Sequence, residues 1–178
     1  NYQQIDALAY ARKLGLLSLG QIASIDPNTI SSVDKSTITK LSAAQISVLT
    51  TAQVAALGTA QIQAIDATDI RTMSADQIAA LSPTQAAALT TSQIANLGTR
   101  LIRSLSASAI ATMSVTQIAS LSVGQVAQLK MEQADALTDD QVLALGTKAS
   151  SLYLSPVILD LNHDGKFSVS VDNGVRFE

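Results

Sequence analysis

The sequence contains no cysteine and little charge. Without cysteine there are no disulfide bonds and no thiolate chemistry, which is compatible with secretion that needs no oxidative folding step. Only 14% of the 178 residues are charged, the net charge is −3, and the 11 Lys and Arg residues are scattered. Electrostatic capture of nucleic acid needs clustered cations, so we expect no nucleic-acid partner.

Aromatic residues and long apolar runs are equally scarce. The five Tyr and Phe residues all lie outside residues 11–152, at Tyr2, Tyr10, Tyr153, Phe167 and Phe177. Stacking on bases is therefore excluded along that tract, and its core must consist of aliphatic residues. No stretch approaches 18 consecutive apolar residues, and residues 1–11 lack the pattern of a signal peptide. We expect a soluble chain with no transmembrane segment.

What the sequence does have is a repeat of eight residues, here called an octad. From Leu41 to Leu145 a large aliphatic residue returns at every eighth position, and a second aliphatic or small residue follows five positions later. A continuous helix would rotate equivalent residues by roughly 80° per octad, so no fixed face could be buried. Short helices that stack on their neighbours satisfy the pattern instead.

Each octad also carries the signals of a helix start. The residue after the octad aliphatic residue is usually Ser, Thr, Asp or Gly, and Gln follows three positions later, which is the spacing of a capping box. Pro27 and Pro83 each directly follow such a cap, at the first helical position, where proline is tolerated. The predicted boxes pair Ser42 with Gln45, Thr50 with Gln53, Ser74 with Gln77, Ser82 with Gln85, Thr90 with Gln93 and Ser114 with Gln117. Asp66, Gly58, Gly98 and Gly146 occupy further expected cap positions.

The repeated Gln has two interpretations. It completes caps and does nothing else, or it forms a polar ladder for self-assembly; the first is the simpler. A longer period is also present, since residues 58–97 align on residues 98–137 to give a 40-residue superrepeat. We interpret this period as five short helices per turn of a superhelix.

These patterns predict the fold class and the domains. The fold is expected to be all-α, a superhelical solenoid of short capped helices with an 8-residue repeat, followed by a short C-terminal β and calcium-loop segment. Residues 1–16 are expected to form a capping helix, residues 17–152 the solenoid, and residues 153–178 the start of a following module.

The C-terminal segment holds the one candidate for chemistry. Oxygen-bearing side chains alternate through a run that has Gly165 at its sixth position, as in a calcium-binding loop. The predicted metal site comprises Asp160, Asn162, Asp164, Lys166 through its carbonyl, Ser168 and Asp172. Val171 occupies the twelfth position, where an EF-hand has a bidentate Glu, so a polar turn between strands 157–160 and 167–171 is the alternative. His163 is expected to face solvent.

The same segment resembles a module of large RTX-type proteins, which bacteria export by type I secretion. The resemblance rests on residues 154–165, which read LSPVILDLNHDG, and on residues 171–177, which read VDNGVRF. Octads such as residues 50–57, TTAQVAAL, are similar to stretches of those proteins. The resemblance implies an extracellular or cell-surface location in bacteria, with calcium held by Asp160, Asn162 and Asp164.

Catalysis is not expected. The only His lies in the predicted calcium loop and there is no Cys, so the usual nucleophilic arrangements are missing. Paired acids such as Asp139 and Asp140, or Asp66 and Asp69, fall at helix starts, where the helix dipole favours them. Asp26-Pro27 resembles the autoprocessing bond of some RTX proteins, but a cap followed by a first-turn proline explains it better.

Three functions remain. The first is a non-catalytic structural or interaction scaffold of a secreted, calcium-associated repeat protein of adhesin or toxin type. The second is a self-assembling extracellular filament subunit, and the third is a membrane-active toxin segment, suggested by the low charge and a mean hydropathy of +0.29. Protein partners or self-association are expected, and contact with a membrane surface is left open.

Overall fold

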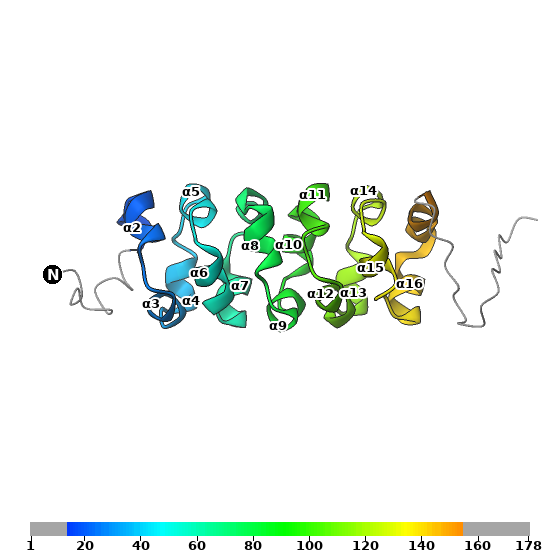
Figure 1. Ribbon diagram of the computed structural model, residues 1–178, viewed down its shortest axis with the longest axis horizontal. Helices are drawn as coiled ribbons and strands as arrows, with labels where there is room; N and C mark the ends of the chain where they lie inside the picture. The colour runs from blue at the N-terminus through cyan, green and yellow to red at the C-terminus, as the bar shows by residue number, and fades with distance from the viewer. Residues whose placement is uncertain (1–13, 155–178) are drawn as a thin grey trace, which may run out of the picture.

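The computed structural model describes residues 14–154, and side chains through Leu152. This part is built of short helices separated by short links, with no β-strand among the described residues. Figure 1 shows an elongated array in which the helices follow one another along the long axis in sequence order. The chain is a repeat protein. The predicted capping helix 1–16 lies almost wholly outside the described residues, as does the predicted β segment.

The helices follow the octads. In the first half of the chain they are η2 (Leu14–Leu16), α2 (Leu19–Ala23), α3 (Pro27–Ser31), α4 (Lys35–Ile38), α5 (Ala43–Ser47), α6 (Thr51–Ala56), α7 (Thr59–Ala64), η3 (Ile70–Thr72) and α8 (Ala75–Ala79). In the second half they are α9 (Pro83–Ala87), α10 (Thr91–Asn96), α11 (Thr99–Ile102), α12 (Ala107–Thr112), α13 (Val115–Ala119), α14 (Val123–Val126), α15 (Met131–Ala134), α16 (Asp139–Leu145) and η4 (Gly146–Leu154).

The capping pattern explains where these helices begin. All six predicted capping boxes are present, with the cap hydroxyl accepting from the Gln amide and the Gln side chain accepting from the cap amide. Pro27 and Pro83 are the first residues of α3 and α9, as predicted. A helix of four to six residues does not persist alone in water, so packing must hold each one in place.

Two expected caps differ from the prediction. Gly146 is not the N-cap of an α-helix. It ends α16 at a φ of 55°, a conformation that favours glycine, and the 3₁₀ helix η4 begins at the same residue. Asp66 precedes a turn and the 3₁₀ helix η3 rather than an α-helix. Its carboxylate accepts from the Thr68 amide two residues on, which holds the chain in an Asx turn.

Helices three octads apart pack on one another. The resulting contacts form three rows. They are α2, α5, η3, α10, α13 and α16; α3, α6, α8, α11, α14 and η4; and η2, α4, α7, α9, α12 and α15. The prediction of five helices per turn is wrong, because the stacking interval depends on the angle between successive short helices, which the 40-residue recurrence does not encode.

The core runs the length of this array. The second aliphatic or small residue of most octads is almost fully buried, as in Ile22, Ile62 and Ile94, and octad aliphatic residues such as Leu89 lie beside them. Each fully buried Leu or Ile contributes about 1.5 to 3 kcal/mol of transfer free energy. One continuous apolar core therefore holds helices that could not exist singly.

Candidate functional site

The repeated Gln side chains are the most constrained polar groups in the molecule. Ten of them are buried, and each bonds in two directions. For Gln53, Oε1 accepts from the Thr50 amide at 2.8 Å, while Nε2 donates to the carbonyls of Ile22 and Ile25 at 2.8 and 2.7 Å. The same pattern, here called the glutamine ladder, recurs at Gln45, Gln61, Gln77, Gln85, Gln93, Gln117, Gln125, Gln133 and Gln141.

The acceptors of the ladder are carbonyls at the ends of earlier helices. Most of these Gln side chains donate to the carbonyls 28 and 31 residues earlier, which belong to the end of a short helix and to the link that follows it. The last carbonyls of a helix have no partner within it. An unsatisfied buried group costs about 1 to 3 kcal/mol, so each Gln protects its cap amide and the link carbonyl from that cost. The helix carbonyl gains a second donor, because it already accepts from a backbone amide, as Ile62 does from Ile65.

The prediction that Gln completes caps and does nothing else is therefore wrong. A polar ladder does exist, but it lies within one chain and joins each helix to the end of the helix four octads earlier, as Gln53 of α6 does with Ile22 of α2. The sequence carried a signal for it. A capping box accepts either Glu or Gln, yet the octads that have a box residue always use Gln. Glu would fill the cap role equally well, but it has no N–H to donate to the two carbonyls.

Some octads lack this Gln. Asp69, Leu101 and Ala109 occupy its position in the octads that begin at residues 66, 98 and 106. In two of them a threonine hydroxyl supplies a single tie, since Thr72 donates to the Ala43 carbonyl at 3.1 Å and Thr112 to the Pro83 carbonyl at 3.0 Å. These two contacts are 40 residues apart in sequence. The superperiod thus marks equivalent local environments although it does not match the stacking interval.

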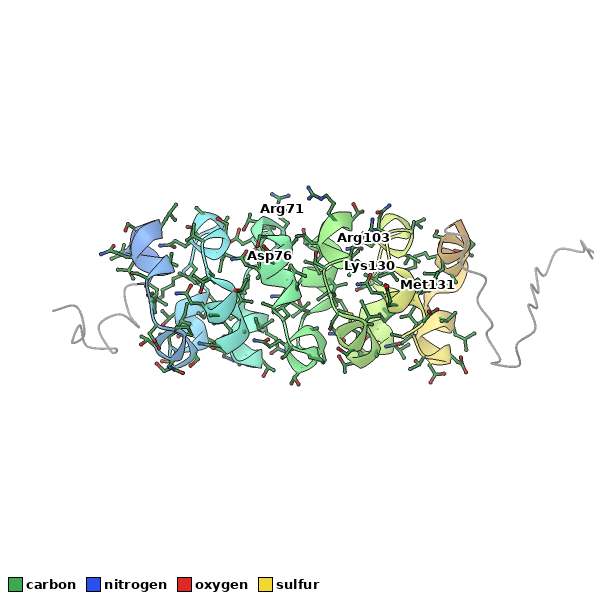
Figure 2. The ribbon with its side chains drawn as sticks, viewed as in Figure 1. Arg71, Asp76, Arg103, Lys130 and Met131 are labelled. Carbon is green, nitrogen blue, oxygen red and sulfur yellow. The ribbon has the colours of Figure 1, made fainter. Side chains whose placement is uncertain are left out.

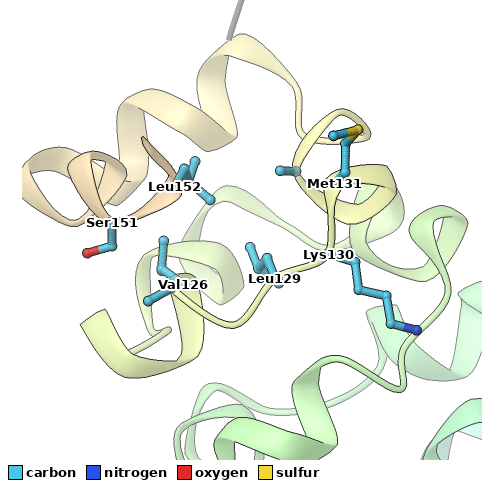
Figure 3. Close-up of a pocket in the computed structure, with 8 residues that line it drawn as sticks. Val126, Leu129, Lys130, Met131, Ser151 and Leu152 are labelled. Atoms are coloured by element: carbon cyan, nitrogen blue, oxygen red, sulfur yellow. The ribbon is translucent and has the colours of Figure 1, made fainter. Parts of the chain in front are cut away.

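At the C-terminal end of the glutamine ladder, a lysine makes the equivalent bonds in place of a glutamine. Lys148 on η4 is half-buried, and its Nζ donates to the carbonyls of Ala119 and Leu121 at 2.5 and 2.9 Å. A small cavity of about 10 Å³ lies nearby, between Val126, Leu129 and Leu152 (Figure 3). That volume holds about one water molecule. It cannot accommodate a substrate.

A much larger hollow lies across α8, α11 and the link between α14 and α15. It is a groove of about 710 Å³, here called the basic groove, lined by the exposed cations Arg71, Arg100, Arg103 and Lys130 together with Gln128. Met73, Ser74, Ala75, Gly98, Leu101 and Ser104 complete its lining, which contains no acidic side chain. Figure 2 labels Arg71, Arg103 and Lys130 on this part of the array, with Asp76 also nearby in the view. Sequence reasoning described the cations as scattered and missed this cluster.

The predicted calcium site cannot be placed, because Asp160, Asn162, Asp164, Lys166, Ser168 and Asp172 lie outside the described residues. Within residues 14–154, no three His, Cys, Asp or Glu side chains lie close enough together to hold a metal ion. In the same range no helix is long and apolar enough to cross a bilayer.

The acidic residues that the sequence placed at helix starts do lie there. Asp139 and Asp140 occupy the first turn of α16, and Asp26 caps α3 by accepting from the Asn28 amide at 2.8 Å. Asp66 accepts from the Thr68 hydroxyl at 2.6 Å and from the Thr68 amide at 2.7 Å, and these bonds hold the pKa of its carboxyl below the ordinary value. The exposure of Asp66 and its local bonds indicate a structural role.

Comparison with known proteins adds one match. Residues 62–99 match the model of a family described as the ALTTAQ repeat. The matched range includes residues 88–93, which read ALTTSQ and span the cap of α10 and its ladder residue Gln93. No curated protein and no solved structure matches the chain.

Proposed function

We propose that this chain is a non-catalytic structural scaffold, a solenoid of short capped helices that acts as a spacer or interaction surface in a secreted, calcium-associated bacterial repeat protein. The observation that carries the proposal is the glutamine ladder. Ten buried side chains tie helices to earlier parts of the chain at a nearly constant offset. Such ties stabilise a defined length, and every buried side-chain nitrogen or oxygen in residues 14–152 has a hydrogen-bond partner.

The ladder makes the scaffold extendable, because each octad contacts only its neighbours. Small-angle X-ray scattering would test this on the full chain and on a variant in which residues 74–97 are duplicated. These residues make up three octads, one stacking interval. We expect the maximum dimension to increase and the helical circular dichroism per residue to stay constant. An unchanged dimension, or loss of helix on duplication, would contradict the spacer.

The calcium part of the proposal is supported by sequence alone, through Asp160, Asn162 and Asp164. Isothermal titration calorimetry of the chain with calcium should give a binding isotherm that the double substitution Asp160→Asn with Asp164→Asn abolishes. Far-ultraviolet circular dichroism of the helical tract should remain almost unchanged by calcium. A helical signal that arises only with calcium would show that the tract and the C-terminal segment do not fold separately.

The extracellular and cell-surface location, and export by type I secretion, rest on the resemblance of residues 154–177 to the RTX module. Expressing the chain in bacteria with and without a type I export machinery, and assaying the culture medium, tests them. We expect the protein in the medium only when the machinery is present.

A filament subunit is the second candidate, and apolar residues near the N-terminal end of the array favour it. Leu16 is 83% exposed and Leu19 is 44% exposed, beside the first described helices. Sedimentation velocity over a hundredfold concentration range would separate the two functions. The filament is favoured if particle size grows with concentration and Leu16→Lys removes this growth. Leu143→Lys on α16 should leave the growth intact. A single monomeric species would support the spacer.

A further inference from the structure

The basic groove lies where the octads depart from their own pattern. At residue 130 the cap is Lys instead of Ser or Thr, and its side chain makes no cap bond to α15. At residue 98 the cap is Gly, and Leu101 replaces the ladder Gln of that octad. Arg71 belongs to another octad without Gln. Departures that are far apart in sequence thus meet in one hollow.

Lys130 places a positive charge at this position and leaves α15 without a side-chain cap bond. Ser, Thr, Asn and Asp stabilise a helix N-terminus by accepting from its free amides, whereas a Lys side chain has no acceptor. Lys130 borders both the small cavity and the basic groove, and Figure 3 shows the end of its side chain extending away from Leu152. Its contribution is therefore to the groove rather than to α15.

The lining of the groove fits an anion with several charges. Guanidinium groups bind carboxylates and sulfates through two parallel hydrogen bonds, and Arg71, Arg100 and Arg103 supply three of them with no carboxylate in the lining. Arg103 also donates to Gln128 Oε1 at 3.4 Å, which ties α11 to the link after α14. The hydroxyls of Ser74 and Ser104 add groups that can bond to hydroxyls of a ligand.

The same surroundings disfavour other polyanions. Residues 14–152 contain no aromatic side chain, so bases of a nucleic acid have nothing to stack on. The described residues form no strand to which an extended acidic peptide could add, and the lining offers no deep apolar pocket for its side chains. An acidic polysaccharide needs neither feature.

We infer that the basic groove binds an anionic polysaccharide, with Arg71, Arg100, Arg103 and Lys130 contacting its carboxylate or sulfate groups. The groove crosses the stacked helices α8 and α11 and the link that follows α14. A linear polymer lying across them would contact several turns of the array at once. This inference does not depend on the spacer function.

The test measures binding of the full chain to heparin, a sulfated polymer, and to polygalacturonate, a carboxylated one, by biolayer interferometry. The double substitution Arg71→Gln with Arg103→Gln should weaken binding by about tenfold or more, since each charge-assisted bond contributes strongly. The matched control is Lys35→Gln with Lys40→Gln, which removes two exposed cations near α4 and should change affinity less than about twofold.

Lys130→Ser sharpens the test because it restores the octad cap. It should raise the thermal midpoint and weaken polysaccharide binding together. Absence of binding to both polymers, equal losses in the two double variants, unchanged affinity of the Lys130→Ser variant, or tighter binding of an oligothymidylate would each overturn the inference.

Discussion

Octads with Gln and octads without it place similar short helices at the same spacing, but they are joined to their neighbours in different ways. In the octad of α10, Gln93 satisfies the cap amide of Thr90 and the carbonyls of Ile62 and Ile65. In the octad of α12, Ala109 fills the same position and Thr112 supplies one bond from the other end of the helix. The first arrangement ties three backbone groups, and the second ties one.

This comparison separates two roles of the octad Gln, which are to cap its own helix and to tie that helix to an earlier part of the chain. A cap needs only an acceptor near the first amides, and octads of either kind have one, as Ser106 shows for α12. The tie to an earlier helix needs a donor that reaches an earlier turn. Octads without Gln are therefore the places where the array is held less tightly and where other side chains have room, as at the basic groove beside Leu101.

The largest effect should come from Gln93→Glu, which keeps the cap acceptor and removes only the donor. We expect a loss of about 3 to 5 kcal/mol in the free energy of unfolding, because the Ile65 carbonyl loses its donor, the Ile62 carbonyl loses one of two donors, and a buried carboxylate faces both. Urea denaturation at neutral pH measures it. Gln63→Glu, at an exposed position of α7, is the matched control and should change stability by less than about 0.5 kcal/mol. If Gln93→Glu were neutral or stabilising, Gln would be a cap residue only.

Thr112→Val tests the weaker tie. The change preserves the shape of the side chain and removes the hydroxyl that donates to the Pro83 carbonyl, so we expect a loss of about 1 kcal/mol. Thr84→Val makes the same replacement at an exposed site on α9. Equal effects of the two variants on the urea midpoint would show that the Thr112 bond contributes nothing specific.

Gly58→Ser should raise stability slightly. Gly58 already has the backbone of a cap, with φ of −72° and ψ of 160°, and an added Cβ would meet only Gln61 Oε1 at 3.6 Å. A serine hydroxyl there can accept from the free amides of α7, which contributes a few tenths of a kcal/mol or slightly more. Differential scanning calorimetry measures the rise. A fall in the midpoint would mean that the ladder Gln and a hydroxyl cap compete at this site.

The smallest effect concerns Asp66, in an octad without Gln. The Thr68 hydroxyl and amide lower the pKa of its carboxyl below 3.8, so its contribution to stability is present above that pH. It is lost as the pH falls through the lowered value. A nuclear magnetic resonance titration should give an Asp66 pKa below 3.8, and Thr68→Ala should raise it. An Asp66 pKa that Thr68→Ala leaves unchanged would contradict this cause.

Local features of the fold could be predicted from the sequence, and distant ones could not. The starts of α5, α6, α9 and α10 followed from Ser, Thr, Pro and Gln at fixed spacing, because capping is decided within four residues. The stacking interval depends on the angles of the links, which no spacing encodes, and the 40-residue period suggested the wrong value. Arg71, Arg103 and Gln128 are far apart in sequence, and the stacking of the helices brings them together in the basic groove.

The glutamine ladder also has a direction. Each Nε2 donates toward the N-terminus, so an octad finds its acceptors only in chain that precedes it, 28 and 31 residues earlier. A chain that orders from its N-terminal end can thus add one helix at a time onto a finished edge, without waiting for anything downstream. Each of these contacts spans about 30 residues, so it can form before the rest of the chain has ordered. We expect the array to form by adding one helix after another at its C-terminal edge, with each Gln fixing the newly added helix to the chain that precedes it.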